Sequence, residues 1–162
     1  MSVTPEVIAF FDKATSSLSY LVREPGSKSC AIIDPVLDFD YASGRVSHES
    51  ADRIVDRVRG EGLAVEWLIE THVHADHLSA APYLKGKLGG RIAIGGGISL
   101  VQNIFGDIFA EGPEFSRDGR QFDHLFQDGE TYRIGDLEAR VLSTPGHTPA
   151  CMTHVMGDAA FV

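Results

Sequence analysis

The chain has 162 residues, of which 43% are hydrophobic and 23% are charged, and its formal net charge is −9. This length is enough for one domain with a buried core, and the composition is ordinary for a globular protein. The acidic charge argues against nucleic acid or an anionic membrane as a partner. No apolar run approaches the roughly 18 residues of a membrane span, and the N-terminus lacks a signal-peptide pattern. We therefore expect a cytoplasmic protein.

The two cysteines, Cys30 and Cys151, agree with this location. They could pair, but a reducing compartment favours two free thiols. The sequence leaves the oligomeric state open, with a homodimer as one alternative.

The first third of the chain predicts strands followed by a helix. Short apolar runs predict strands at 7–11, 18–22 and 30–35, and residues 38–47 are predicted to form an irregular loop. A helix is predicted to begin near Ser47, a suitable N-cap, and to end at the glycines that follow. Its apolar stripe at helical spacing consists of Ala51, Ile54, Val55 and Val58.

The rest of the chain alternates between the two patterns. A helix is predicted from His77 to Leu88, and a second one through 98–101, with a loop over 106–121. Strands are predicted at 63–69, 91–94, 131–134 and 137–143, with a hairpin over 153–162. This mixture predicts an α/β or α+β fold with helices layered on a sheet.

The last residues, 159–162, form an apolar strand pattern with no cap, helix or polar tail after it. This predicts a single domain over residues 1–162 that is incomplete at its C-terminus. The alternative is a natural edge strand at the end of the chain.

The stretch 70–77 carries the strongest functional signal. It follows an apolar run, and four of its residues can hold a metal: His72, His74, Asp76 and His77. Imidazole and carboxylate groups together suit zinc or iron. Polar groups crowded at the end of a buried strand are costly without partners, and a metal ion satisfies all of them.

The spacing of these residues suggests how they lie. Alternate side chains of an extended segment point to the same side, so continued strand geometry places His72, His74 and Asp76 together. His77 can then point elsewhere, and the group can serve one metal ion or two adjacent ions. The alternative is a helix start with exposed histidines and Asp76 as its cap.

The second motif is Ser-Thr-Pro-Gly-His-Thr-Pro at 143–149. Pro145 and Gly146 favour a tight turn after a strand, from which His147 projects. Alone, such a histidine is usually a surface residue. Together with the first motif, His147 is a candidate for a distant ligand that closes the metal site.

The two motifs, His-Val-His-Ala-Asp-His at 72–77 and Thr-Pro-Gly-His-Thr at 144–148, resemble the metallo-β-lactamase superfamily. The resemblance extends from the strand at 63–69 to the C-terminus, and Asp34-Pro35 after the third strand also fits. The motifs are most similar to the persulfide dioxygenase and glyoxalase II branch, which includes bacterial β-lactamase hydrolase-like proteins. The resemblance implies an αββα sandwich, of which this chain holds the N-terminal part, with the metal at one edge.

The resemblance also implies ligand roles. In members with two metal ions, the positions of His72, His74 and His147 hold the first ion, and those of Asp76 and His77 hold part of the second. In persulfide dioxygenases the positions of His72 and His147, with a later aspartate, hold a single iron. The implied cofactor is Fe(II) or Zn(II), as one ion or two.

The sequence departs from the family pattern after His147. The family's next ligand is an aspartate in a Gly-Asp pair at the end of the following strand. Here Gly157-Asp158 falls at the predicted hairpin turn, so we assign no ligand role to Asp158.

The implied substrate is a small thiol compound linked to glutathione. At Ala75 the motif is more similar to the persulfide dioxygenase branch than to glyoxalase II, and this resemblance implies an enzyme that oxidises glutathione persulfide to sulfite. The alternative is a glyoxalase II-like zinc hydrolase of thioesters, in which Asp76 is the catalytic residue that orients the attacking water. A third alternative is a truncated, non-catalytic metal-binding module, because the later ligands are missing.

Other reactive residues have no motif. Cys151 lies four residues after His147, but a small buried residue is the simpler interpretation. His154 is interpreted as a structural or exposed strand residue. His48 and His124 are given no functional role.

Overall fold

The computed structural model describes residues 4–162. Its helices are α1 (Glu49–Glu61), α2 (Ala81–Leu88) and α3 (Ile98–Ile108). The strands of its N-terminal half are β1 (Glu6–Asp12), β2 (Ser17–Arg23), β3 (Ser29–Ile33), β4 (Val36–Asp40), β5 (Arg45–Ser47), β6 (Ala64–Ile69) and β7 (Leu78–Ser79). The remaining strands are β8 (Arg91–Gly95), β9 (His124–Phe126), β10 (Thr131–Ile134), β11 (Leu137–Ser143), β12 (Met152–Met156) and β13 (Ala159–Phe161).

Two sheets form the body of the molecule. The first has the strand order β1-β2-β3-β6-β8-β9, and its last four strands run parallel. The second is an antiparallel sheet of β10 to β13, which confirms the predicted hairpin near the C-terminus. The carboxyl ends of parallel strands meet at one edge of a sheet, and this edge is where ligand sites of α/β proteins form. The loops after β3, β6 and β8 therefore come together.

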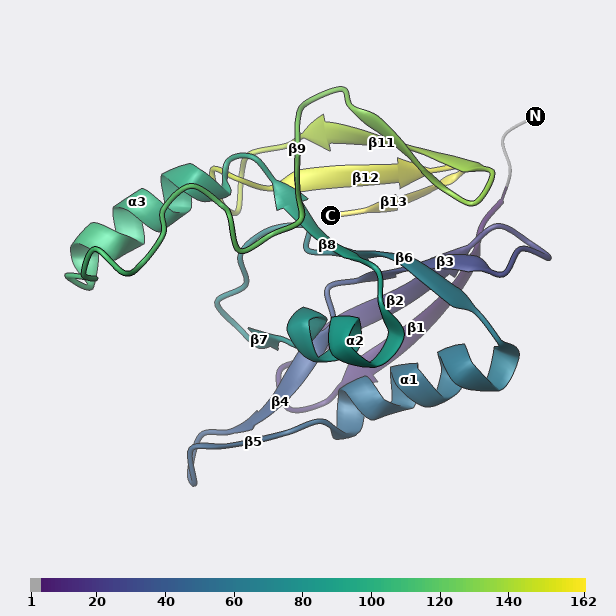
Figure 1. The fold of residues 1–162 in the computed structure, drawn as a ribbon, viewed down its shortest axis with the longest axis horizontal. Coiled ribbons are helices and arrows are strands. Elements are labelled where there is room, and N and C mark those ends of the chain that lie inside the picture. The colour runs from purple at the N-terminus through teal and green to yellow at the C-terminus, as the bar shows by residue number, and fades with distance from the viewer. Residues whose placement is uncertain (1–3) are drawn as a thin grey trace.

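The layers follow from the alternation of side chains along the strands. In β3, Ala31 and Ile33 pack in the core between the two sheets, whereas Cys30 and Ile32 pack against the helices. Figure 1 shows the second sheet on one face of the first sheet, and α1 and α2 on the other. The predicted α/β class and its sandwich of sheets are thus present.

Helix α1 confirms the predicted apolar stripe, since Ala51, Ile54, Val55 and Val58 are its buried residues. The predicted start at Ser47 is wrong by one position, because His48 is the N-cap and makes no side-chain capping bond. Asp38 of β4 accepts hydrogen bonds from the Ser50 amide (2.9 Å) and hydroxyl (2.6 Å) instead. A carboxylate at a helix N-terminus satisfies free amides and opposes the helix dipole.

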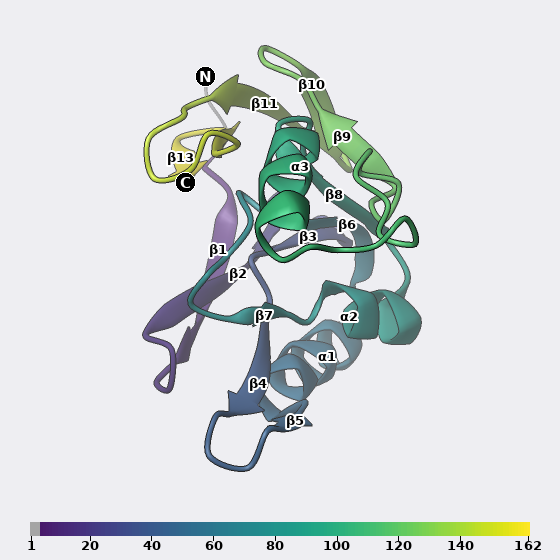
Figure 2. The same ribbon diagram turned by 90° about the vertical axis from the view of Figure 1, so that its left-hand side faces the viewer.

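Residues 38–47 are not an irregular loop. β4 and β5 form a hairpin, and β7 pairs with the other edge of β4 (Figure 2). The Asp40 carboxylate builds the turn by accepting hydrogen bonds from the Ala42 amide and the Ser43 hydroxyl.

The helix predicted from His77 begins at Ala81. β7 comes first, and the Ala80 amide donates to the carbonyl of Pro35, so pairing with β4 keeps this segment extended. The helix predicted through 98–101 is present but continues to Ile108, into the segment predicted as loop.

The thiols of Cys30 and Cys151 are both free, as predicted. Cys30 is buried and Cys151 is partly buried. None of the helices formed by residues 4–162 combines the length and the apolar character of a membrane span.

Candidate metal centre

The histidine loop, residues 70–77, is anchored at the carboxyl edge of the first sheet. It has irregular backbone rather than strand geometry, so the strand does not continue through it. The Glu70 amide donates to the carbonyl of Ala93 on β8, and the carbonyl of Thr71 accepts from the Met152 amide on β12. The loop is therefore fixed to both sheets at its start, where the functional side chains follow.

Asp34, directly after β3, organises the buried side of this loop. Its Oδ1 accepts a hydrogen bond from the Thr71 amide, its Oδ2 accepts one from the Thr71 hydroxyl, and both distances are 2.8 Å. Its backbone has φ +48°, a left-handed conformation that aspartate tolerates better than most residues. The sequence shows Asp34 only as part of a strand-ending Asp-Pro pair.

Asp34 also orients His74. The Nε2 of His74 lies 2.9 Å from Asp34 Oδ1 and 3.4 Å from Glu70 Oε2. Burial lowers the pKa of His74, but the hydrogen bond with Asp34 and the nearby Glu70 carboxyl outweigh burial and raise it to about 10. With both ring nitrogens protonated, Nε2–H donates to Asp34, and Nδ1 faces the other way, 3.8 Å from Asp76 Oδ1.

The four motif histidines form a continuous chain of rings. The ring centroids lie 5.1 Å apart for His147 and His72, 4.1 Å for His72 and His74, and 4.2 Å for His74 and His77. His147 comes from the turn before β12, so the predicted meeting of the two motifs is present. A loop rather than a strand brings His72 and His74 together.

Asp76 lies on the open side of the cluster. Its Oδ2 accepts a 2.7 Å hydrogen bond from the Ser17 hydroxyl at the start of β2 and lies 3.3 Å from Nδ1 of His77. Partial burial raises the pKa of Asp76, but the Ser17 and His77 hydrogen bonds outweigh it and lower the pKa to about 2. The alternative role of Asp76 as a helix cap is wrong, because Ala80 is the N-cap of α2.

Two compact groups of candidate ligand atoms occur among residues 4–162. One consists of His74, Asp76 and His77, and the other of Asp34, Glu70 and His74, with ligand atoms within 4.8 Å of one another in each group. The first metal ion was predicted to bind to His72, His74 and His147. The ring of His72 lies beside the rings of His74 and His147, but these three residues are not one of the two compact groups. Sequence reasoning assigned no site role to Asp34, Glu70 or Ser17. All three residues lie outside the two motifs at 72–77 and 143–149.

One buried atom tests whether the cluster suits a metal ion. His77 is buried, and its Nε2 has no hydrogen-bond partner within the described structure. Burial lowers the pKa of His77, which favours the neutral ring that a metal ion requires. A buried donor or acceptor without a partner is costly, and a metal ion beside Nε2 removes that cost.

A cleft of about 530 Å³ gives solvent access to the cluster. Its walls include Ser17, Tyr20, Asp34 and His147. The turn that carries His147 is held by Cys151, because the Thr148 amide lies 3.2 Å from its Sγ. Cys151 thus shapes the turn, and its side chain is partly rather than fully buried.

The family model described as "Metallo-beta-lactamase superfamily" matches residues 12–162. The chain belongs to the metallo-beta-lactamase superfamily. It is 56% identical over 153 residues to a "Probable metallo-hydrolase" of Burkholderia pseudomallei, covering 94% of this chain and 52% of that protein. It is 49% identical to a "Beta-lactamase hydrolase-like protein" of Xylella fastidiosa, covering 98% and 37%.

Two further relatives have more specific names. The chain is 43% identical to "Glyoxylase B2" of Dictyostelium discoideum, covering 97% of this chain and 54% of that protein. It is 27% identical to a mitochondrial persulfide dioxygenase of Homo sapiens, covering 91% and 46%. The solved structure of ETHE1 from Myxococcus xanthus matches with a TM-score of 0.69 at 25% identity, covering 96% and 56%. The chain spans about half the length of the curated relatives it matches.

Proposed function

We propose that this chain contributes the metal centre of a metallo-hydrolase that acts on a thioester of a small thiol such as glutathione. The buried Nε2 of His77 without a partner carries the proposal, because His77 belongs to a cluster of imidazole and carboxylate groups. This donor set suits Zn(II) or Fe(II).

Each residue of the cluster has a distinct role in this function. His72, His74 and His147 would hold one metal ion, and Asp76 with His77 would hold a second ion or complete the ligand shell of the first. Asp34 fixes the ring of His74 through Nε2, which leaves Nδ1 as the ligand atom. A second hydrogen bond of this kind fixes the tautomer and the direction of a metal-binding histidine.

A metal ion at such a site polarises a carbonyl group and makes water more acidic. The ionised carboxylate of Asp76 faces the cleft and orients the attacking water by accepting a hydrogen bond from it. The Ser17 hydroxyl keeps this carboxylate in place and charged. The cleft beside His147 and Tyr20 admits the thioester.

A persulfide dioxygenase is the second candidate, and the sequence motif with Ala75 favours it. The names of the more similar relatives favour the hydrolase: the metallo-hydrolase at 56% and the glyoxylase at 43% identity, against 27% for the dioxygenase. Both candidates use His72 and His147 as ligands, so the reaction distinguishes them. Hydrolysis of an acyl-glutathione under nitrogen supports the hydrolase, whereas oxygen uptake with glutathione persulfide and iron supports the dioxygenase.

Metal titration tests the site itself. Co(II) added to the chain is expected to give a saturable visible absorption, with an affinity that His77→Ala and His72→Ala each lower at least about tenfold. His48→Ala is the matched control, because His48 stacks on Tyr83 outside the cluster. If the wild-type chain gives no saturable absorption, or if His48→Ala weakens it equally, the proposed metal site is wrong.

A further inference from the structure

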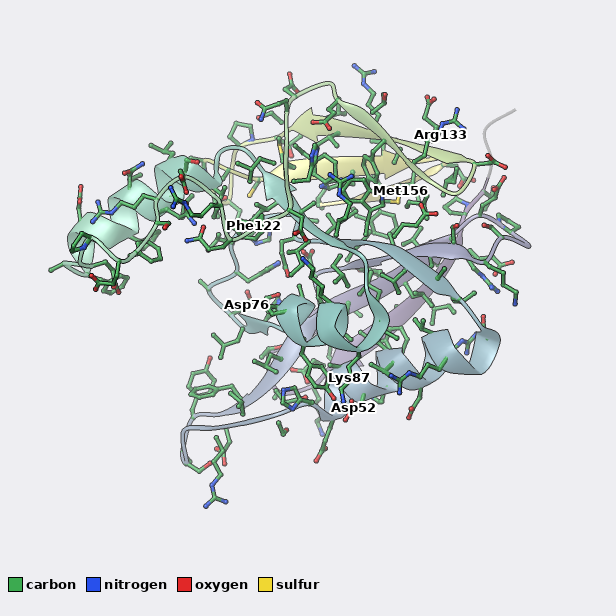
Figure 3. The ribbon with its side chains drawn as sticks, viewed as in Figure 1. Asp52, Asp76, Lys87, Phe122, Arg133 and Met156 are labelled. Atoms are coloured by element: carbon green, nitrogen blue, oxygen red, sulfur yellow. The ribbon has the colours of Figure 1, made fainter. Side chains whose placement is uncertain are left out.

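Helix α3 leaves the body of the molecule partway along its length. Its first turns pack through Ile98 and Val101 in a small core that also contains Ile94 and Ala150. In Figure 3 the labelled Phe122, which packs against this core, lies where the helix leaves the sheets. Figure 1 shows the rest of α3 extending beyond both sheets. The second half of the helix therefore lies outside the body that residues 4–162 form.

This second half nevertheless keeps the apolar pattern of a buried helix. Phe105 and Phe109 follow Ile98 and Val101 at helical spacing, so they continue the same face of α3. They are 48% and 68% exposed, and their rings stack with centroids 6.0 Å apart. The inward face of the helix thus continues past the core that it was buried against.

A second apolar row runs beside this face. Its residues recur every four positions, which places them next to one another on the helix surface, and all of them are exposed. The two exposed rows together are here called the α3 ridge, which consists of Leu100, Ile104, Phe105, Ile108 and Phe109.

The other flank of α3 is covered by the chain itself. Arg117, on the segment that returns along the helix, pairs with Asp107 and donates to the carbonyls of Asn103 and Glu111. It lies so close to Gly106 that a Cβ there would be 2.7 Å from the guanidinium carbon. Asp107 is the one charged residue of α3. The fold thus covers the polar flank and leaves an uncharged apolar ridge exposed.

The charge of the molecule selects what this ridge binds. The chain has a net charge of −9, so two copies meet with the least repulsion through a face that carries no charge. A basic partner finds no carboxylate on the ridge to pair with. Helices that lie on membranes carry Lys or Arg on their polar face, and α3 has neither. These properties favour a second copy of the chain.

The area of the ridge is sufficient for a pair of copies. Complete burial of a phenylalanine removes about 150–250 Å² from water, so burial of the exposed parts of Phe105 and Phe109 removes roughly 200 Å². The three aliphatic side chains, which are 43% to 65% exposed, add a similar area. Two facing ridges therefore bury roughly 900 Å², and the polar rim brings this to the roughly 1,000 Å² that specific interfaces require.

We propose that the α3 ridge is an interface between two copies of this chain, whose α3 helices pack antiparallel about a two-fold axis. Rows of side chains four residues apart interlock in such helix pairs. Ile104, in the middle of its row, then meets Ile104 of the second copy, and Leu100 meets Ile108 of the second copy. A two-fold contact closes on itself, so assembly stops at the dimer.

Sedimentation velocity over a concentration series tests the assembly. The mass is expected to rise from 17.5 kDa to twice this value, with a dissociation constant on the order of 10 μM, because an interface of this size is weak. A mass that stays at 17.5 kDa at millimolar concentration, or that grows beyond the dimer, overturns the proposal.

Two charge variants at the centre of the ridge test whether the occupant is a second copy. Ile104→Glu and Ile104→Lys each place like charges opposite one another in a pair of identical copies, so each should weaken the dimer at least about tenfold. An equimolar mixture of the two variants pairs Glu with Lys and should recover this affinity. Val46→Glu is the matched control, because Val46 is 52% exposed on β5, and it should leave the dimer unchanged. A mixture that stays monomeric, or equal weakening by Val46→Glu, overturns the proposed contact.

Two further measurements complete the test. Ile104 is 43% exposed, so the circular dichroism spectra of its variants should match the wild type. Recovery of the dimer in the mixture also shows that both variants are folded. Neutral phosphatidylcholine vesicles test the other apolar occupant. A monomeric wild type that binds these vesicles, with binding lost in Ile104→Glu, replaces the second copy by a lipid surface and overturns the proposal.

Discussion

The two sides of the candidate metal centre differ in how the fold holds them. On the inner side, the side chains of Asp34 and Glu70 are 9% and 5% exposed, and Asp34 bonds to backbone and side-chain groups of the histidine loop. On the outer side, the Asp76 side chain is 52% exposed and is bonded to Ser17 and its neighbour His77. The inner side is thus held in place by buried hydrogen bonds within the fold, whereas the outer side is exposed to solvent in the cleft.

Because of this difference, substitutions on the two sides should affect different properties: the stability of the fold on the inner side and the affinity for metal on the outer side. Changes on the inner side leave buried polar groups without partners, so they should lower the free energy of unfolding. Changes on the outer side affect groups that water can still reach, so they should lower metal affinity and leave stability nearly intact.

The largest effect is expected from Asp34→Ala. This change leaves the Thr71 amide, the Thr71 hydroxyl and His74 Nε2–H without their acceptor, and it places alanine at a left-handed φ of +48°. Loss of one partner from a buried ion pair typically costs about 3–5 kcal/mol, and we expect a loss of this size in urea unfolding of the metal-free chain. Asp34→Asn, which keeps an acceptor and tolerates this conformation, should lose less than half as much.

The control for this variant is Asp136→Ala. Asp136 lies in the exposed turn between β10 and β11, and its replacement should change the unfolding free energy by less than about 0.5 kcal/mol. If Asp34→Ala lowers the free energy of unfolding no more than this control does, the inner side does not contribute to stability as proposed.

His154 extends the comparison to a buried histidine outside the cluster. It is 0% exposed, its Nδ1 lies 3.0 Å from the Tyr132 hydroxyl, and burial lowers its pKa from 6.5 to about 4. The folded chain therefore binds this proton less well than the unfolded chain. The stabilising contribution is complete above about pH 6.5 and is lost as the pH falls toward 4, by roughly 3 kcal/mol.

The measurement compares urea unfolding at pH 7.5 and pH 4.5. His154→Asn, which can still bond to Tyr132, should lose about 2.5 kcal/mol less between these values than the wild type. Other histidines titrate in both proteins, so the difference isolates His154. An unchanged pH dependence in His154→Asn would refute the buried neutral ring.

The sequence was sufficient for the parts of this centre that local patterns encode. The motif predicted His72, His74, Asp76, His77 and His147 as neighbours, and the structure brings their side chains together. The motif left the backbone of the histidine loop open, because a continued strand and an irregular loop can both bring His72 and His74 together.

The supporting residues could not be predicted in the same way. Asp34 contacts His74 across 40 positions of sequence, and Ser17 contacts Asp76 across 59, so each pairing depends on the sheet that joins them. The hairpin of β4 and β5 was missed for a related reason. Its pairing depends on the Asp40 turn and on β7, which lies far along the chain.

The smallest expected effect lies on the outer side, at Ser17→Ala. The Ser17 hydroxyl donates to Asp76 across 2.7 Å, and loss of such a supporting bond typically lowers metal affinity by 10- to 100-fold. We expect a value near tenfold in the cobalt titration, because water can replace the hydroxyl at an exposed carboxylate. Ser17→Thr should restore the affinity. Ser43→Ala removes a similar 2.8 Å bond to Asp40 and should leave cobalt binding unchanged. If Ser17→Ala binds cobalt as the wild type does, Asp76 does not depend on β2 for its position, and the outer side is organised by the metal ion itself.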